Sequence, residues 1–192
     1  GSEMCIRDRF VDTINTNCTL LLALINDILD LSRIESGSMD FRFAGYNLTF
    51  VMQQIYDSQR LSMPCGVDLV MKLPEGESKS IVTDSVRLKQ VINNFINNAK
   101  KFTTQGAITF GYETEDPGYT VFFVEDTGSG ISEENQRRIF ERFYKVDSFT
   151  QGAGLGLSIC QTIVERFRGE INVSSELGKG TRFTVRVPDF NE

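Results

Sequence analysis

Histidine is absent from all 192 residues of the chain. A catalytic triad or general base built on histidine is therefore excluded, and so are most zinc sites. The four cysteines, Cys5, Cys18, Cys65 and Cys160, have neither metal-ligand nor redox spacing, so we expect reduced thiols, with Cys18 and Cys160 as small apolar residues. The longest apolar run, residues 20–25, is too short to cross a bilayer, and no secretory signal is visible.

Positive charge is also in short supply. The 26 acidic and 20 basic residues give a net charge of -6, which provides no general attraction to nucleic acid or to an anionic membrane. We therefore expect no nucleic-acid partner. A hydrophobic content of 40% and a charged content of 24% are typical of a soluble globular protein. We expect a cytoplasmic location, with any membrane anchor of the intact protein outside this chain.

Residues 10–35 are predicted to form one long helix. Apolar and small residues recur at the 4-3 spacing of a helix-bundle seam, namely Ile14, Cys18, Leu21, Ile25, Ile28 and Ser32. Leu20, Leu24, Leu31 and Ile34 widen the apolar surface, so the helix needs partners on more than one side. Gly37 is the predicted C-cap.

The rest of the chain alternates between strand and helix patterns. We predict strands at 41–43, 67–72 and 80–82, helices at 48–62 and 85–101, a hairpin of 107–113 with 119–126 around Asp116-Pro117-Gly118, a helix beginning at Ser132, a helix at 155–168 ending at Gly169, and a hairpin of 170–174 with 181–187. This order predicts an α/β sandwich, a sheet with one face covered by helices.

Four asparagines stand in the amphipathic helix 85–101, although asparagine is a poor helix former. On a helical wheel Asn94, Asn98 and Lys101 lie within about 60° of one another. Amide oxygens can bind a hard cation, and an ammonium can bind phosphate. The alternative is a solvated polar face, which is the expected environment for Asn93 and Asn97.

The segment VEDTGSGIS places Asp126 at the end of a strand, followed by Gly128 and Gly130. Glycines let the backbone approach a ligand, and a carboxylate at a pocket wall accepts hydrogen bonds only. It would therefore suit adenine, which offers an exocyclic amine, and not guanine. The alternative is an Asx turn, for which Asp-x-Gly is a common sequence.

A glycine-rich segment, GAGLGLSI, contains Gly152, Gly154 and Gly156 immediately before an apolar helix. Backbone N–H groups at such a helix start form a phosphate site, and the alternative is a flexible connector.

A further amphipathic stretch lies just upstream of these glycines. We expect Ile139, Phe140 and Phe143 to anchor in the core, and Arg142 and Lys145 to be able to close over phosphates.

The order of these motifs resembles the ATP-binding domain of sensor histidine kinases. Its N, G1, F and G2 boxes match Asn-x-x-x-Asn-Ala, Asp-x-Gly-x-Gly, Phe-x-x-Phe and Gly-x-Gly-x-Gly here. LINDILDLSRIESG, residues 24–37, looks like the second helix of the dimerisation and histidine-phosphotransfer hairpin, and SELGKGTRF, residues 175–183, looks like the family's closing hairpin.

The resemblance implies a Bergerat-type α/β sandwich, a mixed sheet covered on one face by three helices and preceded by one long bundle helix. Residues 1–37 would be the end of the phosphotransfer hairpin, without its phosphoacceptor helix, and residues 38–192 the catalytic domain. ATP and Mg²⁺ are the implied cofactors. By position, Asn98 and Asn94 would bind Mg²⁺, Lys101 and Lys145 would reach the phosphates, and Asp126 with Gly128 and Gly130 would bind adenine. Gly152, Gly154, Leu155 and Gly156 would line the phosphate side, with 147–151 as the lid.

The implied reaction is transfer of the ATP γ-phosphoryl group to a histidine outside this chain, for relay to an aspartate of a response regulator. The implied partners are ATP or ADP, the chain's own missing phosphoacceptor helix, a receiver domain and a second copy bound through the N-terminal helix. The alternatives are a gyrase- or Hsp90-like ATPase, which would have glutamate where Asn94 stands, a degenerate domain acting as a dimeric scaffold, and an anti-sigma-type serine kinase.

Overall fold

The computed structural model describes residues 2–76, 78–114, 118–146 and 152–189. In chain order the elements are α1 (Ser2–Glu35), β1 (Ala44–Asn47), α2 (Leu48–Gln59), the 3-10 turn η1 (Arg60–Ser62), β2 (Val67–Lys72), β3 (Ser80–Thr83), α3 (Ser85–Phe102), β4 (Gly106–Glu113), β5 (Tyr119–Asp126), α4 (Glu133–Gln136), α5 (Gly156–Arg166), β6 (Glu170–Glu176) and β7 (Gly180–Pro188).

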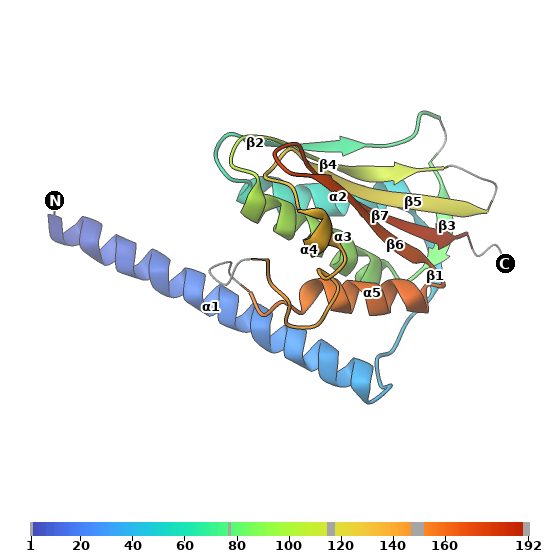
Figure 1. The fold of residues 1–192 in the computed structure, drawn as a ribbon, viewed down its shortest axis with the longest axis horizontal. Coiled ribbons are helices and arrows are strands. Elements are labelled where there is room, and N and C mark those ends of the chain that lie inside the picture. Colours follow the sequence, from blue (N-terminus) through green and yellow to red (C-terminus); the bar gives the residue numbers. More distant parts are fainter. Residues whose placement is uncertain (1, 77, 115–117, 147–151, 190–192) are drawn as a thin grey trace.

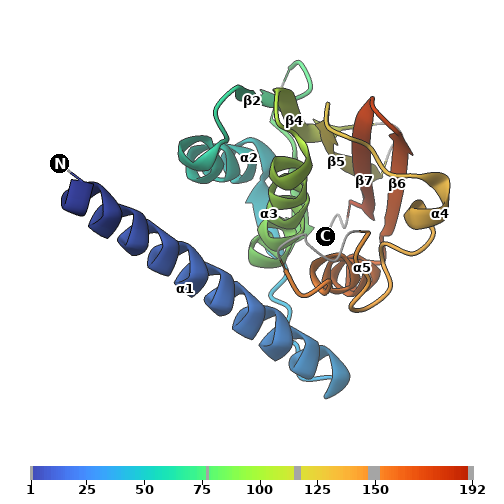
Figure 2. The same cartoon turned by 60° about the vertical axis from the view of Figure 1, so that its left-hand side comes forward.

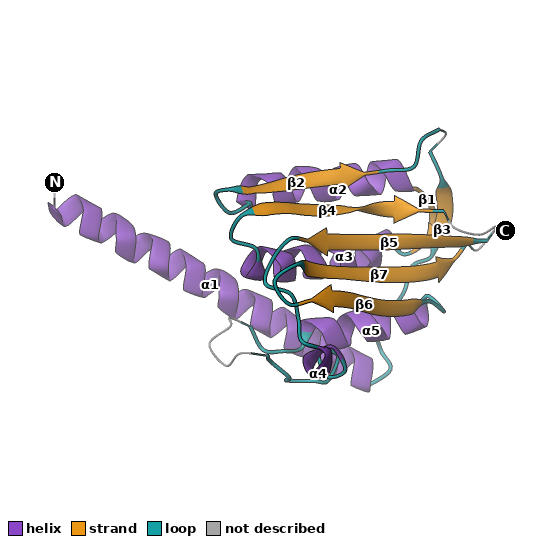
Figure 3. Ribbon diagram, turned by 45° about the horizontal axis from the view of Figure 1, so that its top comes forward, coloured by secondary structure: helices purple, strands orange, loops and turns teal. Residues whose placement is uncertain are grey.

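Five strands form a mixed sheet in the order β2-β4-β5-β7-β6 (Figure 3). The pair β2 and β4 is parallel, and the pairs β4–β5, β5–β7 and β6–β7 are antiparallel. The short strands β1 and β3 pair with each other in a separate two-stranded sheet. The central strands β5 and β7 carry Asp126 and Thr181 opposite each other, so both residues stand at the same end of the sheet.

Helices α2, α3 and α5 cover one face of the sheet (Figures 1 and 3). The core between them is built from the apolar stripe of each helix and the inward residues of each strand, and Phe95, Phe110, Phe122 and Phe167 are among its largest fully buried side chains. Phe95 of α3 stacks on Phe183 of β7 with ring centroids 4.8 Å apart. The predicted α/β sandwich with one helical face is confirmed.

The long helix α1 runs beside α5, and its N-terminal half projects away from the sandwich (Figures 1 and 2). Leu31 and Ile34 pack against the core, whereas the seam residues Ile14, Leu21 and Ile28 are more than half exposed. Gly37 takes φ of +67° as the predicted C-cap. None of the helices in the described part of the chain is both long and apolar enough to span a bilayer.

Some local predictions are wrong. Residues 41–43 form no strand, because Phe41 and Phe43 stack on each other and pack edge-on against Phe167, and the strand begins only at Ala44. Arg168, with φ of +54°, takes the left-handed position after α5 that was expected at Gly169.

One further difference concerns a cysteine, and one predicted turn is not tested. Cys160 is buried as predicted, but Cys18 is exposed. The predicted Asp116-Pro117-Gly118 turn falls largely outside the described residues.

Candidate functional site

A cavity of about 580 Å³ opens between α3, the end of β5, the start of α5 and α1. Most of the predicted site residues line it: Asn94, Asn98, Lys101, Asp126, Gly130, Lys145, Gly152, Gly154 and Gly156. Gly128 and Leu155 do not. The predicted lid, 147–151, lies outside the described residues. The cavity therefore brings together segments that are far apart in the sequence.

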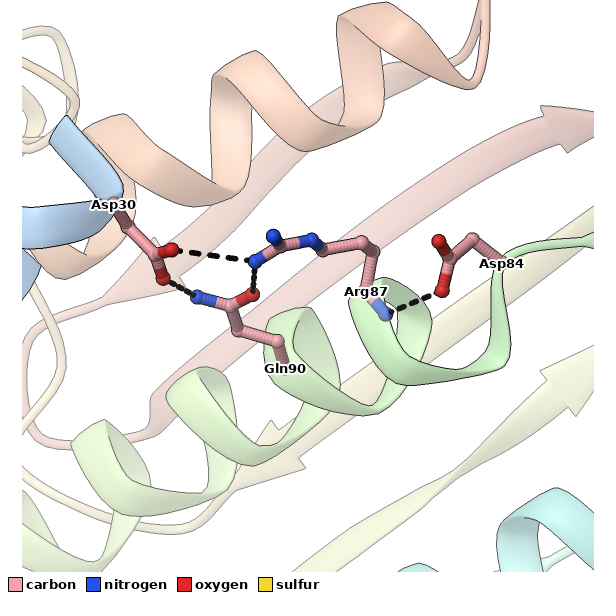
Figure 4. Close-up of polar contacts among 4 residues, drawn as sticks. All are labelled: Asp30, Asp84, Arg87 and Gln90. Atoms are coloured by element: carbon pink, nitrogen blue, oxygen red, sulfur yellow. Dashed lines mark hydrogen bonds and ion pairs between the residues drawn. The ribbon is translucent and has the colours of Figure 1, made fainter. Parts of the chain in front are cut away.

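Helix α3 begins where Asp84 acts as its N-cap. Asp84 Oδ1 accepts a hydrogen bond from the backbone N–H of Arg87 at 3.1 Å (Figure 4). The same oxygen accepts the N–H of Val86 at 2.9 Å, and Oδ2 accepts the N–H of Arg42 at 2.8 Å. These bonds satisfy N–H groups that the helix itself leaves unpaired. One buried carboxylate thus fixes the start of the helix and the segment that arrives from α1.

The asparagines of α3 divide between two surfaces. Asn94 and Asn98 face the cavity, and Asn98 Nδ2 donates to Asn94 Oδ1 at 3.3 Å. Asn93 is half-buried on the other side and accepts a hydrogen bond from Gln59 Nε2 at 2.9 Å, so its expected solvent exposure is wrong. Asn97 is exposed, as expected, at the cavity rim.

The ammonium groups of Lys101 and Lys145 both line the cavity. Burial lowers the pKa of Lys101, the nearby charge of Lys145 lowers it further, and the charge of Asp27 opposes this. A Cβ atom added at Gly152 would stand 3.5 Å from Lys101 Nζ, which places the ammonium against the glycine-rich loop. Two ammonium groups in one cavity favour an anionic ligand.

Asp126 ends β5 as a buried residue, 7% exposed. Its Oδ1 accepts the N–H of Gly128 at 2.8 Å, so the Asx turn weighed from the sequence is present, and the side chain also lines the cavity. Burial raises the pKa of Asp126, and hydrogen bonds from the backbone N–H groups of Gly128 and Thr181 oppose this. A buried acceptor with a raised pKa at a cavity wall is typical of a functional site.

The loop after Asp126 is attached to α3. Ser129 N–H donates to the carbonyl of Phe102 at 3.1 Å, at the last residue of α3. Gly130 has φ of +70°, and a Cβ atom there would stand 2.1 Å from the carbonyl oxygen of Glu176. Only glycine fits this approach, so Gly130 lets the loop pass between α3 and the β6–β7 hairpin.

The glycine-rich segment leads into α5 directly beside α3. Gly154 has φ of +72°, and its carbonyl accepts the N–H of Phe143 at 2.9 Å. A Cβ atom added at Gly156 would stand 2.4 Å from Asn94 Nδ2. Leu155, in contrast, is fully buried, so its side chain belongs to the core.

The segment before the glycines differs from expectation at two residues. Ile139 is buried and Phe140 packs edge-on against Phe183, as predicted, but Phe143 is 66% exposed with φ of +62°. Its left-handed backbone turns the chain toward Gly154 and the side chain toward solvent. Arg142 Nη1 meets Glu35 Oε1 of α1 at 2.6 Å and does not line the cavity.

Two groups of residues that line the cavity were not predicted from the sequence. Thr181 and Phe183 come from β7, and their signal was the Gly-Thr-x-Phe segment that had been assigned only to a hairpin. Ala23, Leu24 and Asp27 come from α1. For α1 the available signal was Asp27, a single acidic residue at helical spacing from Leu24 and Leu31.

The residues present fit a nucleotide with a magnesium ion. The described residues hold no cluster of three or more carboxylate or thiol ligands, so a metal ion here would depend on amide oxygens together with ligand phosphates. The amides of Asn94 and Asn98, the ammonium groups and the glycine-rich loop stand at one part of the cavity, and Asp126 provides an acceptor at its wall. A mixed sheet with one helical face and this donor set define a nucleotide-binding α/β sandwich.

Comparison with known proteins identifies the family. Residues 83–191 match the family described as histidine kinase-, DNA gyrase B- and HSP90-like ATPase, and the chain belongs to it. Over 192 aligned residues it is 35% identical to the sensor histidine kinase RcsC of Escherichia coli strain K12, an alignment that covers 94% of this chain and 20% of RcsC.

Two further similarities agree with this. The autoinducer 2 sensor kinase/phosphatase LuxQ of Vibrio cholerae is 38% identical over 178 residues, covering 88% of this chain and 20% of LuxQ. The crystal structure of full-length ShkA in complex with AMPPNP matches with a TM-score of 0.84 and 28% identity, covering 96% of this chain and 39% of ShkA. The chain is thus an ATP-binding domain homologous to sensor histidine kinases, and it spans about a fifth of the length of these curated relatives.

Proposed function

We propose that this chain is the catalytic region of a two-component sensor histidine kinase. It binds Mg-ATP and transfers the γ-phosphoryl group to a histidine outside the chain, for relay to an aspartate of a response regulator. The observation that carries the proposal is the meeting of Asp126, Asn94, Asn98 and Lys101 in one cavity. An ATP-like ligand is also supported by the similarity to ShkA, whose structure contains AMPPNP.

Asp126 would bind the adenine base. One carboxylate oxygen is already engaged by Gly128 N–H, and the carboxylate still lines the cavity as an acceptor. The exocyclic amine of adenine is a donor at the position where guanine has a carbonyl, so guanine would meet acceptor with acceptor. The side chains of Ile139 and Phe183 supply apolar surface for the ring.

The phosphates would lie between α3 and the glycine-rich start of α5. Lys101 and Lys145 would neutralise phosphate charge, and Asn98, assisted by Asn94, would hold Mg²⁺ through amide oxygen. Bound magnesium would supply further neutralisation of the charge that develops on the phosphoryl group. The absence of side chains at Gly152 and Gly156 leaves room for this ligand close to the backbone.

Transfer is favoured over hydrolysis. Phosphoryl transfer requires the protein to position its reactants and neutralise charge, and it needs no covalent step on this chain. Asn94 stands where gyrase- and Hsp90-like ATPases have a glutamate, and an amide cannot act as a general base for water. Because the chain contains no histidine, the acceptor must be supplied by another segment or subunit.

The long helix supports the remaining part of the proposal. Residues 1–37 would be the second helix of a dimerisation and phosphotransfer hairpin, and residues 38–192 the catalytic domain. The exposed seam of α1 would bind the phosphoacceptor helix and a second subunit. A receiver domain of the response regulator would then approach the phosphorylated hairpin.

Titration calorimetry with ATP, ADP and GTP in the presence of Mg²⁺ tests the proposal. We expect ATP and ADP to bind, and GTP to bind at least about tenfold more weakly, because its base leaves the buried carboxylate unmatched. Asn98→Ala should weaken Mg-ATP binding about tenfold or more, since it removes a contact to a charged group. The control is Asn172→Ala, the same change at an exposed position of β6, which should bind as wild type does.

The outcomes separate the rival functions. Equal affinity for ATP and GTP would overturn the adenine assignment. Steady-state ATP hydrolysis at the rate of a gyrase-like enzyme would favour the ATPase. Failure to bind any of the nucleotides would favour a scaffold without catalysis.

A further inference from the structure

Helix α1 contributes directly to the wall of the nucleotide cavity. Ala23, Leu24 and Asp27 line it, although they precede the family match at residues 83–191 by more than fifty positions. The ATPase domain alone therefore does not enclose the site. Of these three residues Asp27 alone is charged, and it shares the cavity with Lys101, Asn94 and Asn98.

The position of Asp27 is set by a polar junction one turn further along α1. Asp30 Oδ2 accepts a hydrogen bond from Gln90 Nε2 at 2.6 Å, and Asp30 Oδ1 lies 3.4 Å from Arg87 Nη1, which itself donates to Gln90 Oε1 at 2.8 Å (Figure 4). The side chains of Arg87 and Asp30 are 14% and 15% exposed. A largely buried pair of this kind is weakly screened by salt, and loss of one partner leaves a buried charge.

Two further contacts hold α1 in the same position. Leu31 and Ile34 pack against the core, and Glu35 Oε1 meets Arg142 Nη1 at 2.6 Å. The last three turns of α1 are therefore fixed on the sandwich by apolar packing between two ion pairs. In this docked position the Asp27 carboxylate faces the cavity.

Asp27 and Lys101 influence each other electrostatically. Burial and the neighbouring charge of Asp30 raise the pKa of Asp27, while the charge of Lys101 opposes this. The charge of Asp27 in turn opposes the fall in the pKa of Lys101 that burial and Lys145 cause. An acidic group thus shares the cavity with the cation that would receive phosphate.

We infer that Asp27 is a specificity-determining residue of the nucleotide site. Its carboxylate makes the site favour ADP over ATP as long as α1 is docked through the Asp30–Arg87–Gln90 junction. This rests on the proposed function and deepens it. ATP carries one more phosphoryl group and one more negative charge than ADP, and a carboxylate beside the phosphate-binding cation repels that charge. Release of α1 removes the carboxylate, and by linkage ATP binding favours the released state.

The first test is Asp27→Asn, which keeps the shape of the side chain and removes its charge. Calorimetry with Mg-ATP and Mg-ADP gives the ratio of the two dissociation constants. We expect the ratio to shift by about three- to tenfold toward ATP at low ionic strength, and by less in high salt. The matched control is Asp68→Asn, the same charge change at an exposed position of β2 that does not line the cavity, and its ratio should equal that of wild type.

The second test asks whether docking carries the effect. In Asp30→Ser with Arg87→Ser both charges of the junction are removed, so that neither is left buried alone. On this background Asp27→Asn should change the ratio less than about twofold, which a double-mutant cycle measures directly. Hydrogen exchange of the α1 backbone should rise in the same variant and report release.

The possible results separate the effect of Asp27, the role of α1 docking and the proposed function. An unchanged ADP/ATP ratio in Asp27→Asn would overturn the inference, and so would weaker ATP binding, which would instead make Asp27 a ligand of Mg²⁺. An undiminished effect on the released background would overturn the role of docking. If wild type binds neither ATP nor ADP, the proposed function fails as well, whereas binding of both with an unshifted ratio leaves that function intact.

Discussion

Asn93 and Asn94 are neighbours on α3, yet they belong to different surfaces. Asn93 accepts a hydrogen bond from Gln59 and ties α3 to the end of α2, whereas Asn94 receives the amide of Asn98 at the cavity. Each of these poor helix formers has a hydrogen-bond partner, which for Asn93 lies on α2 and for Asn94 lies one turn further along α3. A polar residue in an amphipathic helix can therefore serve packing or ligand binding, and its neighbours decide which.

Asp126 leads to a prediction about pH. Its pKa is raised in the folded state, so the folded protein holds more protons than the unfolded chain between the two pKa values. The stability contributed by this group is present below the unfolded pKa and is lost as pH rises through the folded pKa. The amide introduced by Asp126→Asn would not titrate, and its oxygen could keep the hydrogen bond from Gly128 N–H.

We therefore expect Asp126→Asn to gain stability relative to wild type as pH rises from about 4 to the folded pKa, by at most about 1.4 kcal/mol per pH unit. Urea denaturation of both proteins across this range measures the difference, which should level off above the folded pKa. The same variant should lose its preference for ATP over GTP. A stability difference that shrinks as pH rises would contradict the assignment of a raised pKa.

At the scale of elements, the start of α5 and the middle of α3 approach so closely that a side chain at position 156 would displace the Asn94 amide. A Cβ atom there would stand 2.4 Å from Asn94 Nδ2 and 2.9 Å from Asn94 Oδ1. Both atoms belong to the far end of a side chain, which can move aside. The close approach therefore determines where the Asn94 amide points.

Gly156→Ala should lower the affinity for Mg-ATP by roughly fivefold or more, equivalent to about 1 kcal/mol, without lowering stability. Alanine favours a helix over glycine by up to ~1 kcal/mol, which offsets the displacement of one side chain. Calorimetry and thermal unfolding measure the two effects. The control is Gly45→Ala in β1, where φ is ordinary and nothing lies within 4 Å. Normal ATP affinity in Gly156→Ala would show that the Asn94 position is unimportant.

Local chemistry predicted much of this arrangement. The helix start at Ser132, the wheel position of Asn98 and the glycine spacing around Gly154 each depend on nearby residues. The strands and helices follow the predicted order. Non-local packing decided the rest. The sequence predicts a strand at Phe41 and Phe43, but both side chains pack against Phe167 instead. It predicts a phosphate contact for Arg142, but this residue forms an ion pair with Glu35. The periodicity of apolar residues in the sequence does not predict which distant residue a side chain will contact.

At the scale of the whole molecule, α1 has two apolar faces in different environments, one packed on the sandwich and one exposed. Leu24, Leu31 and Ile34 turn toward the sandwich, and the seam with Ile14 and Leu21 stays exposed. The apolar surface of such a helix can be covered in two ways, by self-association or by folding back on the catalytic domain. The structure uses the second for one face only, which leaves the other face for a partner helix.

The last prediction is that the chain self-associates through the exposed seam of α1. Phe10, Ile14, Leu21, Ile25 and Ile28 are between 43% and 65% exposed, and burial of each such side chain contributes ~1.5–3 kcal/mol. Their 4-3 spacing suits packing against a second helix.

Light scattering coupled to gel filtration should show a mass that rises with concentration. Leu21→Glu, which keeps helix propensity, should raise the dissociation constant at least about tenfold, because a carboxylate would enter the apolar seam. Leu61→Glu, at a residue 87% exposed on η1, should leave association unchanged. A chain that stays monomeric at every concentration would contradict the prediction, and equal loss of association in both variants would point to an interface other than α1.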